Sequence, residues 1–271
     1  MDQYLVYGNP IKQSRSPFIH QAFAQSTEQN ISYQSQLVAL DGFAEEVQRF
    51  IKQGGKGANV TAPFKEQAMQ LCDHLTKRAE LAGAVNTLTF IDGEIFGDTT
   101  DGDGLVNDLL ANQVVLKNQR ILLIGAGGAA KGVVLPLLEQ EPKQLIIANR
   151  TLSKAQAIIE QYPNYPISCC SFDQVIDYDF DVIINATSAG LNGQALPISA
   201  EVIKPNVTCY DMTYSKELTS FLKVAQQRQA KKLIDGLGML VGQAAVSFEI
   251  WRKVKPDTQA VLTRLRDEMN R

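Results

Sequence analysis

Short apolar runs alternate along the chain with stretches whose apolar residues recur at helical spacing. In the first hundred residues the runs predict strands at 4–7, 35–40, 57–60, 88–91 and 94–96. Asp92-Gly93 separates the last two and is typical of a hairpin with a type I′ turn. An amphipathic helix is expected over 43–51, and further helices are expected to begin at Ser16-Pro17 and at Pro63.

The character of the chain changes near Gly102, where a helix is expected to lead into a series of buried strands. These strands are expected at 121–124, 145–148, 182–184, 207–210 and 232–234, with helical stretches between them. Such alternation predicts a parallel, doubly wound sheet. After Gly236 the pattern becomes helical over 239–251 and 257–269. No local feature decides which domain these last helices join.

The sequence Gly125-Ala126-Gly127-Gly128-Ala129-Ala130 follows the first of these strands directly. Gly125 suits a tight turn, Gly127 lets the backbone approach a pyrophosphate, and Ala130 is small enough for a helix to pack on its strand. A helix that begins near Gly127 would direct free backbone N–H groups at the phosphates. The pattern therefore predicts a dinucleotide site.

The second strand of this region ends in Asn149-Arg150-Thr151, with Lys154 one helical turn later. An NAD site usually has Asp or Glu here, which binds the ribose 2′-hydroxyl. Arg150 instead suits bidentate binding of a 2′-phosphate, and Thr151 suits capping of the next helix and a bond to the same phosphate. The sequence thus favours NADP(H).

Composition restricts the remaining possibilities. The chain has 271 residues, of which 45% are hydrophobic and 20% charged, so two modest domains are expected. A net charge of −3 without a basic tract argues against a nucleic-acid partner. No apolar run approaches the roughly 20 residues of a membrane span, and no export signal is recognised, so a cytoplasmic location is expected. The four cysteines lack metal-binding spacing, and the two histidines, His20 and His74, are interpreted as surface or helix residues.

Three polar clusters precede the dinucleotide region, and each falls at a predicted junction between elements. They are Ser14-Arg15-Ser16-Pro17, the stretch 59–65 that ends in Lys65, and Asn86-Thr87 together with 97–102. Hydroxyls, amides, one ammonium and one carboxylate suit a small polyhydroxylated acid as ligand. Taken singly, Ser16 or Asp101 is equally interpretable as a helix cap, and Asn86 as a turn residue.

These motifs together resemble the shikimate dehydrogenase family over essentially the whole chain. The resemblance is carried by Gly8-Asn9-Pro10, Ser14-Arg15-Ser16-Pro17, Asn59-Val60-Thr61-Ala62-Pro63-Phe64-Lys65, Ala82-Gly83-Ala84-Val85-Asn86-Thr87, the Gly125 loop, Asn149-Arg150-Thr151, Asn185-Ala186-Thr187, and Asp235-Gly236-Leu237-Gly238-Met239-Leu240 with Gln243. It implies an N-terminal α/β substrate domain and a Rossmann NADP-binding domain. It further implies that the C-terminal helices return to the substrate domain, which would span 1–101 plus 239–271 around a cofactor domain at 102–238.

The resemblance also implies roles for individual residues. Lys65 and Asp101 are expected to be catalytic and to flank the reacting carbon. The expected substrate-binding residues are Ser14, Ser16, Thr61, Lys65, Asn86, Asp101, Tyr214 and Gln243. The expected cofactor-binding residues are Gly125, Ala126, Gly127, Gly128, Ala129, Asn149, Arg150, Thr151, Lys154, Thr187, Met212, Gly236 and Met239.

The chain departs from the family pattern in a few places. Thr99 stands where Asn is common, and Asp103 adds a charge beside Asp101. Ala62 and Gly242 replace a common Val and a frequent Ala. Thr99 and Asp103 are the departures expected to influence Asp101 or the affinity of the site.

The function expected from the resemblance is reversible NADPH-dependent reduction of 3-dehydroshikimate to shikimate in aromatic amino acid biosynthesis. A relative that oxidises quinate with NAD is one alternative, which Arg150 and Lys154 disfavour. A catalytically idle NADPH-binding regulatory module is another, which Lys65 and Asp101 disfavour. No metal and no macromolecular partner are expected. The sequence leaves a monomer and a homodimer equally open.

Overall fold

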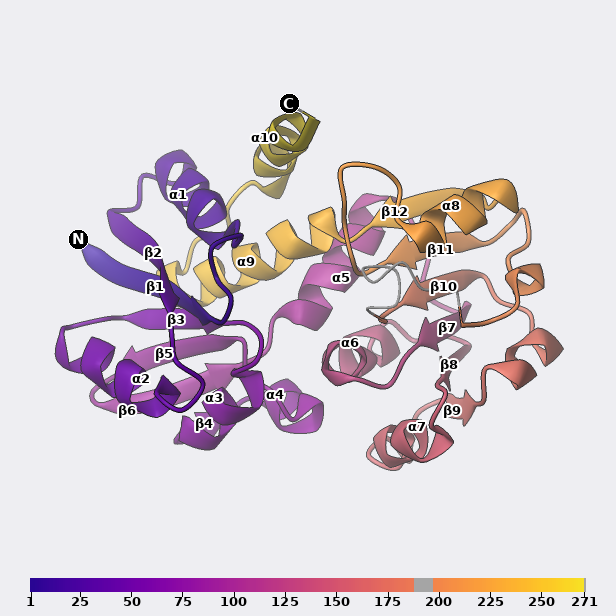
Figure 1. Ribbon diagram of the computed structural model, residues 1–271, viewed down its shortest axis with the longest axis horizontal. Coiled ribbons are helices and arrows are strands. Elements are labelled where there is room, and N and C mark those ends of the chain that lie inside the picture. Colours follow the sequence, from indigo (N-terminus) through magenta and orange to yellow (C-terminus); the bar gives the residue numbers. More distant parts are fainter. Residues whose placement is uncertain (188–196, 271) are drawn as a thin grey trace. The chain divides into compact units, whose positions relative to one another are not determined.

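The computed structural model describes residues 1–187 and 197–270, which form two compact units (Figure 1). The first unit contains residues 1–104 and 240–269, and the second contains residues 105–239. Helices α5 (Asp101–Ala111) and α9 (Leu237–Arg252) each include a boundary between the units. Among the described residues, no helix is both long and apolar enough to span a bilayer.

The first unit is built on a mixed sheet, which contains six strands among the described residues. Their order is β2 (Ile31–Leu37), β1 (Asp2–Gly8), β3 (Gly57–Val60), β5 (Thr87–Ile91), β6 (Glu94–Asp98) and β4 (His74–Leu75). Strands β2, β1 and β3 are parallel, whereas β5 runs antiparallel to β3 and β6. The connecting helices are α1 (Ser16–Ser26), α2 (Phe43–Lys52), α3 (Lys65–Leu71) and α4 (Lys77–Ala82).

Most of the elements expected in this unit are confirmed. Strand β3 has the predicted bounds, and the β5–β6 hairpin turns at Asp92 (φ 51°) and Gly93 (φ 89°), as a type I′ turn requires. Strand β2 was misplaced, because it covers Ile31–Leu37 and ends before residue 40. It lies at the edge of the sheet, and its exposed polar residues weaken the apolar signal.

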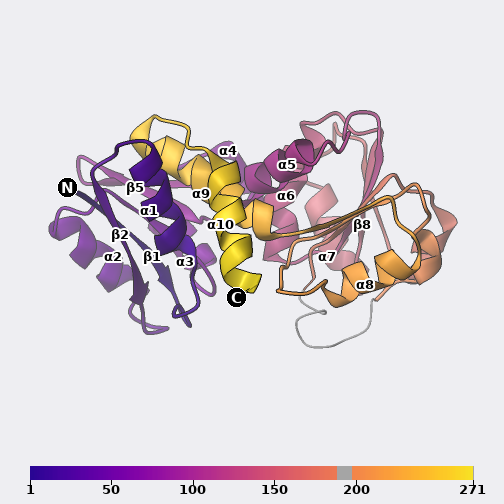
Figure 2. The same cartoon turned by 90° about the horizontal axis from the view of Figure 1, so that it is seen from above.

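Residues 240–269, which include most of the two C-terminal helices, belong to the first unit. Trp251 at the end of α9 donates from its indole Nε1 to the carbonyl of Leu88 over 3.1 Å. Helix α10 (Thr258–Asn270) lies alongside α1 (Figure 2), where Arg15 Nη1 and Glu268 Oε2 are 3.7 Å apart. These contacts connect α9 to β5 and α10 to the start of α1.

The second unit contains the predicted doubly wound sheet. Its strands have the order β12 (Lys232–Asp235), β11 (Thr208–Asp211), β10 (Val182–Asn185), β7 (Arg120–Ile124), β8 (Gln144–Ala148) and β9 (Ile167–Cys170), and all neighbouring pairs are parallel. From β7 the chain adds β8 and β9 on one side and then returns to add β10, β11 and β12 on the other side. This is the Rossmann order, and it places the topological switch point at the carboxyl ends of β7 and β10.

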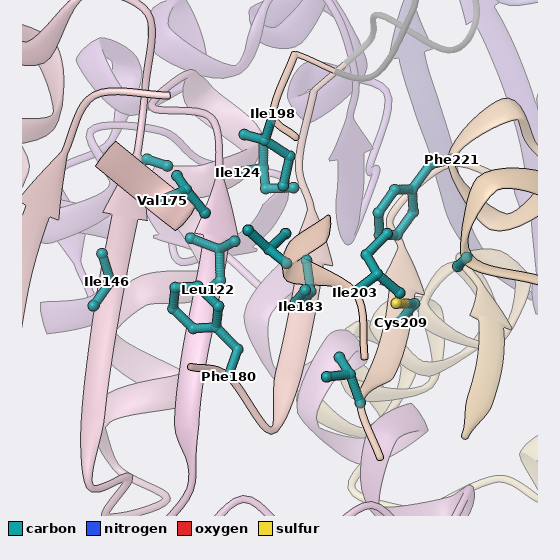
Figure 3. Close-up of a cluster of buried hydrophobic side chains, with 14 of the residues drawn as sticks. Leu122, Ile124, Ile146, Val175, Phe180, Ile183, Ile198, Ile203, Cys209 and Phe221 are labelled. Atoms are coloured by element: carbon teal, nitrogen blue, oxygen red, sulfur yellow. The ribbon is translucent and has the colours of Figure 1, made fainter. Parts of the chain in front are cut away.

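The core of this unit is apolar on both faces of the sheet because parallel strands are covered by helices. One face is packed by Leu122, Ile146 and Ile183 from the strands, beneath Val175 and Phe180 (Figure 3). The α-helices described between the strands of this sheet are α6 (Gly128–Leu138), α7 (Leu152–Ile159) and α8 (Ser220–Gln227). Each such side chain contributes about 1.5–3 kcal/mol when it leaves water, so the strand ends have a rigid base.

Candidate active site

Lys65 and Asp101 lie side by side in the first unit, with Lys65 Nζ 2.5 Å from Asp101 Oδ2. Lys65 is the first residue of α3 and Asp101 the first residue of α5. The Lys65 side chain is 32% exposed and that of Asp101 is 18% exposed, so both groups are reachable from solvent yet partly shielded. The structure therefore brings together the two residues expected to be catalytic, while their roles stay predictions.

Asn86 holds the other oxygen of the same carboxylate. Its Nδ2 donates to Asp101 Oδ1 over 2.9 Å and to Thr100 Oγ1 over 3.0 Å. The backbone N–H of Asn86 donates to the carbonyl of Asp98, and its carbonyl accepts from Val60 N, so the residue joins β3 to the end of β6. Asp101 thus has a cation on one oxygen and an amide donor on the other.

Thr61 follows β3 directly, and Gly8 at the end of β1 makes room for it. A Cβ atom at Gly8 would lie 2.6 Å from Thr61 Cγ2, closer than side chains tolerate. Ser14 and Ser16 occupy the entry to α1, where Ser16 N donates to Ser14 Oγ over 3.3 Å. Ser16 is the first helical residue rather than an N-cap with a capping bond, and it is 9% exposed.

Gln243 reaches this group from α9. Its Oε1 lies 3.5 Å from Asn86 Nδ2, and its Nε2 donates to the carbonyl of Leu240. The adjacent Gly242 packs against the backbone of Gly104 in α5, where an added Cβ would meet the carbonyl oxygen at 3.0 Å. The glycine found in place of a frequent alanine therefore permits close approach of the two helices.

Asp103, the extra acid beside Asp101, is paired with Arg78 of α4. Arg78 also binds Asp98 through two nitrogens, each 2.7 Å from a carboxylate oxygen. Burial opposes the charge of Arg78, but these carboxylates outweigh it and raise the pKa of the guanidinium. Thr99 is buried, and its N–H donates to Asp98 Oδ1. The two residues that depart from the family pattern therefore have defined partners: Asp103 pairs with Arg78, and Thr99 donates to Asp98.

The predicted dinucleotide loop connects β7 to α6 in the second unit. Gly125 has φ 110°, a conformation that requires glycine, and its backbone packs near Thr187, whose Cγ2 would lie 3.0 Å from an added Cβ. No atom of the residues that the structure describes lies within 4 Å of a Cβ placed at Gly127 or Gly128. Ala126 is buried, Ala129 is exposed, and Ala130 is a fully buried residue of α6. These residues suit a pyrophosphate laid against the N-terminus of α6.

Arg150, Thr151 and Lys154 are exposed at the end of β8 and the start of α7. Arg150 and Lys154 form no ion pair with any residue of 1–187 or 197–270. Asn149 donates from Nδ2 to the carbonyl of Thr151 over 2.8 Å and shapes this turn. Thr151 occupies the N-cap position, but its side chain makes no capping hydrogen bond, so that expectation was wrong.

The residues expected around the nicotinamide gather at the carboxyl ends of neighbouring strands. Thr187 Oγ1 donates to Asn185 Oδ1 over 2.7 Å after β10, and Met212 N donates to the carbonyl of Asn185 after β11. At Gly236, after β12, an added Cβ would lie 2.3 Å from the Met212 carbonyl oxygen. Met239 is buried in the first turns of α9.

Tyr214 is the one expected substrate ligand that lies in the second unit, on the segment after β11. That segment is anchored by Asp211, which is fully buried and accepts from Thr219 Oγ1 (2.6 Å) and from Thr213 N (3.1 Å). Burial raises the pKa of Asp211, and these hydrogen bonds oppose the rise. Sequence reasoning missed Asp211, whose only signal was an acid at the end of a buried strand.

Five buried residues with polar groups lie behind Asn86: Tyr33, Asn59, Thr87, Thr100 and Ser247. Asn59, Thr87 and Thr100 belong to the polar clusters recognised in the sequence, but sequence reasoning missed Tyr33 and Ser247. Within the described residues, no group of three or more His, Cys, Asp or Glu side chains is placed to hold a metal ion.

Three family models match the chain in sequence order. Residues 6–88 match the shikimate dehydrogenase substrate binding domain, residues 108–193 match shikimate / quinate 5-dehydrogenase, and residues 236–266 match the shikimate 5′-dehydrogenase C-terminal domain.

Individual proteins are similar over nearly the full length. The shikimate dehydrogenase (NADP(+)) of Colwellia psychrerythraea is 58% identical over 98% of this chain and 96% of its own. An Ael1 enzyme from Pseudomonas putida has a TM-score of 0.95 at 42% identity, covering 98% of both chains. A Thermus thermophilus shikimate 5-dehydrogenase, solved in complex with NADP(H) and shikimate, has a TM-score of 0.89 at 29% identity, covering 98% of this chain and 99% of its own.

Proposed function

Because this chain belongs to the shikimate dehydrogenase family, we propose that it interconverts 3-dehydroshikimate and shikimate with NADP(H). It is an oxidoreductase of the shikimate pathway, as the names of its relatives indicate. In the direction of synthesis, the carbonyl of the substrate is reduced to a hydroxyl. The reaction consumes one hydride and one proton.

The arrangement of Lys65, Asp101 and Asn86 is the observation that carries this proposal. The Lys65 ammonium lies 2.5 Å from the Asp101 carboxylate, and the Asn86 amide holds the other oxygen of that carboxylate. The group is therefore preorganised to transfer one proton to or from a hydroxylated ring of the substrate. We assign substrate binding and catalysis to residues 1–101 plus 239–271, and cofactor binding to residues 102–238.

Bound NADPH supplies the hydride, and the protein's own residues handle the rest of the reaction. As the carbonyl is reduced, negative charge develops on its oxygen. The Lys65 ammonium stabilises that charge and then donates the proton from Nζ. Asp101 orients Lys65 through Oδ2 and accepts a hydrogen bond from a neighbouring hydroxyl of the substrate.

The remaining polar residues orient the substrate and the cofactor. Ser14 and Ser16 bind the carboxylate, while Thr61, Asn86 and Gln243 bind ring hydroxyls, and Tyr214 adds a further contact. The loop at 125–129 binds the pyrophosphate of the cofactor. The 2′-phosphate is bound by Arg150, Thr151 and Lys154. The nicotinamide is bound by Thr187, Met212, Gly236 and Met239. Two observations on the described residues support this assignment. Space is open around Gly127 and Gly128, and Arg150 and Lys154 are exposed and form no ion pair.

The test is steady-state oxidation of shikimate with NADP and NAD compared side by side, and of quinate with both cofactors. We expect shikimate with NADP to give the highest kcat/KM. A preference for quinate with NAD would instead favour the alternative of an enzyme that oxidises quinate. If neither substrate led to reduction of either cofactor, an enzymatic role would be refuted. The cytoplasmic location stays a prediction, and the choice between monomer and homodimer stays open.

A further inference from the structure

We propose that Ser247, on helix α9, is a positioning residue that fixes the orientation of the Asn86 amide and, through it, the carboxylate of Asp101. The proposal rests on the activity proposed above. Ser247 acts through other side chains and belongs to none of the motifs that indicated the family. Its place in the structure is one helical turn after Gln243.

The Ser247 hydroxyl lies at the centre of a buried polar cluster. Its Oγ is 2.8 Å from Thr87 Oγ1, 3.2 Å from Thr100 Oγ1 and 3.0 Å from Asn59 Nδ2. It is also 3.1 Å from the carbonyl oxygen of Gln243, one turn earlier in the same helix. The side chain of Ser247 is fully buried, so these partners are its alternatives to water. A serine here therefore connects strands β3 and β5 and the start of α5 to α9.

The two threonines that Ser247 bridges are the ones that hold the amide oxygen of Asn86. Thr87 Oγ1 donates to Asn86 Oδ1 over 2.7 Å. Thr100 approaches the same oxygen with its N–H at 3.0 Å and its hydroxyl at 3.2 Å. With Oδ1 held on this side, Nδ2 must face Asp101 Oδ1 at 2.9 Å. A reversed amide would place an oxygen against the carboxylate, which is repulsive.

The hydrogen bonds connect Asn59 to Asn86 through Ser247 and Thr87. Asn59 Nδ2 donates to Ser247 Oγ, and Thr87 Oγ1 donates to Asn86 Oδ1. The one proton of Ser247 has two acceptors within reach, the Gln243 carbonyl oxygen at 3.1 Å and Thr87 Oγ1 at 2.8 Å. Asn86 Nδ2 then donates to Asp101, whose other oxygen accepts from Lys65. Bonds aligned in this way polarise one another in a low-dielectric interior. Ser247 is the central link, because its Oγ contacts both Thr87 Oγ1 and Thr100 Oγ1 and thereby fixes the positions of these two hydroxyls.

The far end of the network is closed by aromatic rings. Tyr33 donates from its hydroxyl to Asn59 Oδ1 over 2.7 Å, and the ring of Tyr33 stacks on that of His20 at 4.1 Å between centroids. Both rings are buried. The orientation of Asn59, and hence its donation to Ser247, is therefore fixed by packing as well as by hydrogen bonding.

The first test is Ser247→Ala in the full-length protein. We expect kcat/KM for shikimate to fall about tenfold, which corresponds to about 1.4 kcal/mol. The KM for NADP should stay within twofold of wild type, because the residues assigned to the cofactor lie in the second unit. Tyr7→Phe is the matched control. It removes one buried hydroxyl of the same unit, bonded to the Glu46 carbonyl, and should leave kcat/KM for shikimate within twofold.

A double-mutant cycle with Thr87→Val separates positioning from a loss of stability. If Ser247 acts through Thr87, the double variant should be no more impaired in kcat/KM than the worse single variant. Ser247→Cys, which nearly keeps the side-chain size and weakens its hydrogen bonds, should lie between wild type and Ser247→Ala and provides the comparison if the alanine variant does not fold.

Three results would overturn the proposal. They are a wild-type kcat/KM in folded Ser247→Ala or Ser247→Cys, additive losses in the cycle, and an equal rise in the KM for NADP. A wild-type protein without shikimate oxidation would overturn the proposed function and this proposal with it, whereas an active wild type with unaffected Ser247 variants would overturn this proposal alone.

Discussion

Replacing His20 by Phe should remove an acid-sensitive point from the core of the first unit. His20 lies on α1 and is fully buried, and neither ring nitrogen has a hydrogen-bond partner within the described residues. Its ring stacks on Tyr33 with only 5° between the planes. Burial lowers the pKa of His20 from 6.5 to about 3. The folded protein therefore keeps this imidazole neutral where the unfolded chain would protonate it.

The sign and size of the effect follow from proton linkage. Between pH 6.5 and about 3 the unfolded state binds one proton more at His20, so the free energy of unfolding falls as the pH decreases through this window. Above pH 6.5 the contribution of His20 to stability is fully present. One pKa unit corresponds to 1.36 kcal/mol, so the loss is about 2 kcal/mol at pH 5 and about 5 kcal/mol at pH 3. Such a loss is a large part of a typical domain's 5–15 kcal/mol.

The assay is urea unfolding at pH 7.5 and pH 5.0, followed by the fluorescence of Trp251. Trp251 is the only tryptophan in the sequence, and its ring lies 5.5 Å from that of His20, so it reports on the same core. The free energy of unfolding of wild type should drop by about 2 kcal/mol more between these pH values than that of His20→Phe. Any overpacking by Phe acts at both pH values and cancels in the difference.

The other histidine provides the control. His74 is exposed, so His74→Gln should keep the wild-type pH dependence. If wild type and His20→Phe lose stability equally between pH 7.5 and pH 5.0, the assignment of acid sensitivity to the buried imidazole is refuted.

Four further substitutions test the site and its support. Lys65→Ala should lower kcat at least about 100-fold with a much smaller rise in KM, and an unchanged kcat in steady-state assays would exclude Lys65 as the proton donor. Arg150→Ala should weaken NADPH binding about tenfold or more while leaving NADH nearly unchanged in a fluorescence titration, and equal weakening of both would remove the 2′-phosphate assignment. Asp103→Asn should cost less than about 1 kcal/mol in urea unfolding and leave kcat within about threefold because Asp98 still holds Arg78, and a larger change in kcat would mean that Asp103 acts on Asp101. Gly238→Ala should destabilise the second unit by about 1–3 kcal/mol or more, because its Cβ would lie 2.0 Å from Asp108 Oδ1, and an unchanged melting temperature would contradict this packing.

The fold was predictable wherever apolar periodicity is strong. Strands β7, β8 and β10 are buried on both faces, and their continuous apolar runs were recognised to within a residue or two. The type I′ hairpin was predictable because Asp92-Gly93 is one of the few pairs that tolerate two positive φ angles. Two edge strands, β2 and β9, were less predictable, since they are only partly buried and their apolar signal is weak.

The supports of the site were harder to predict than the residues expected to do chemistry. Lys65 and Asp101 stood out by their motifs, but only the fold shows that α3 and α5 begin beside each other. Asn59, Thr87 and Ser247 are buried and hydrogen-bonded to one another. In the sequence such residues cannot be distinguished from exposed polar residues, because burial depends on strands and helices that lie far apart along the chain.

The passage of α5 and α9 across the two boundaries has a consequence during protein synthesis. Residues 105–239 form one uninterrupted stretch that carries all six described strands of the second sheet, so this unit can fold before the rest of the chain is made. The N-terminal 104 residues must wait for that stretch and then for α9, because Trp251 closes onto Leu88 and Arg252 onto Asp2. In topological terms, the second unit is an insertion within the first. A premature stop near residue 240 would therefore spare the later-encoded unit and leave the earlier-encoded one unfinished.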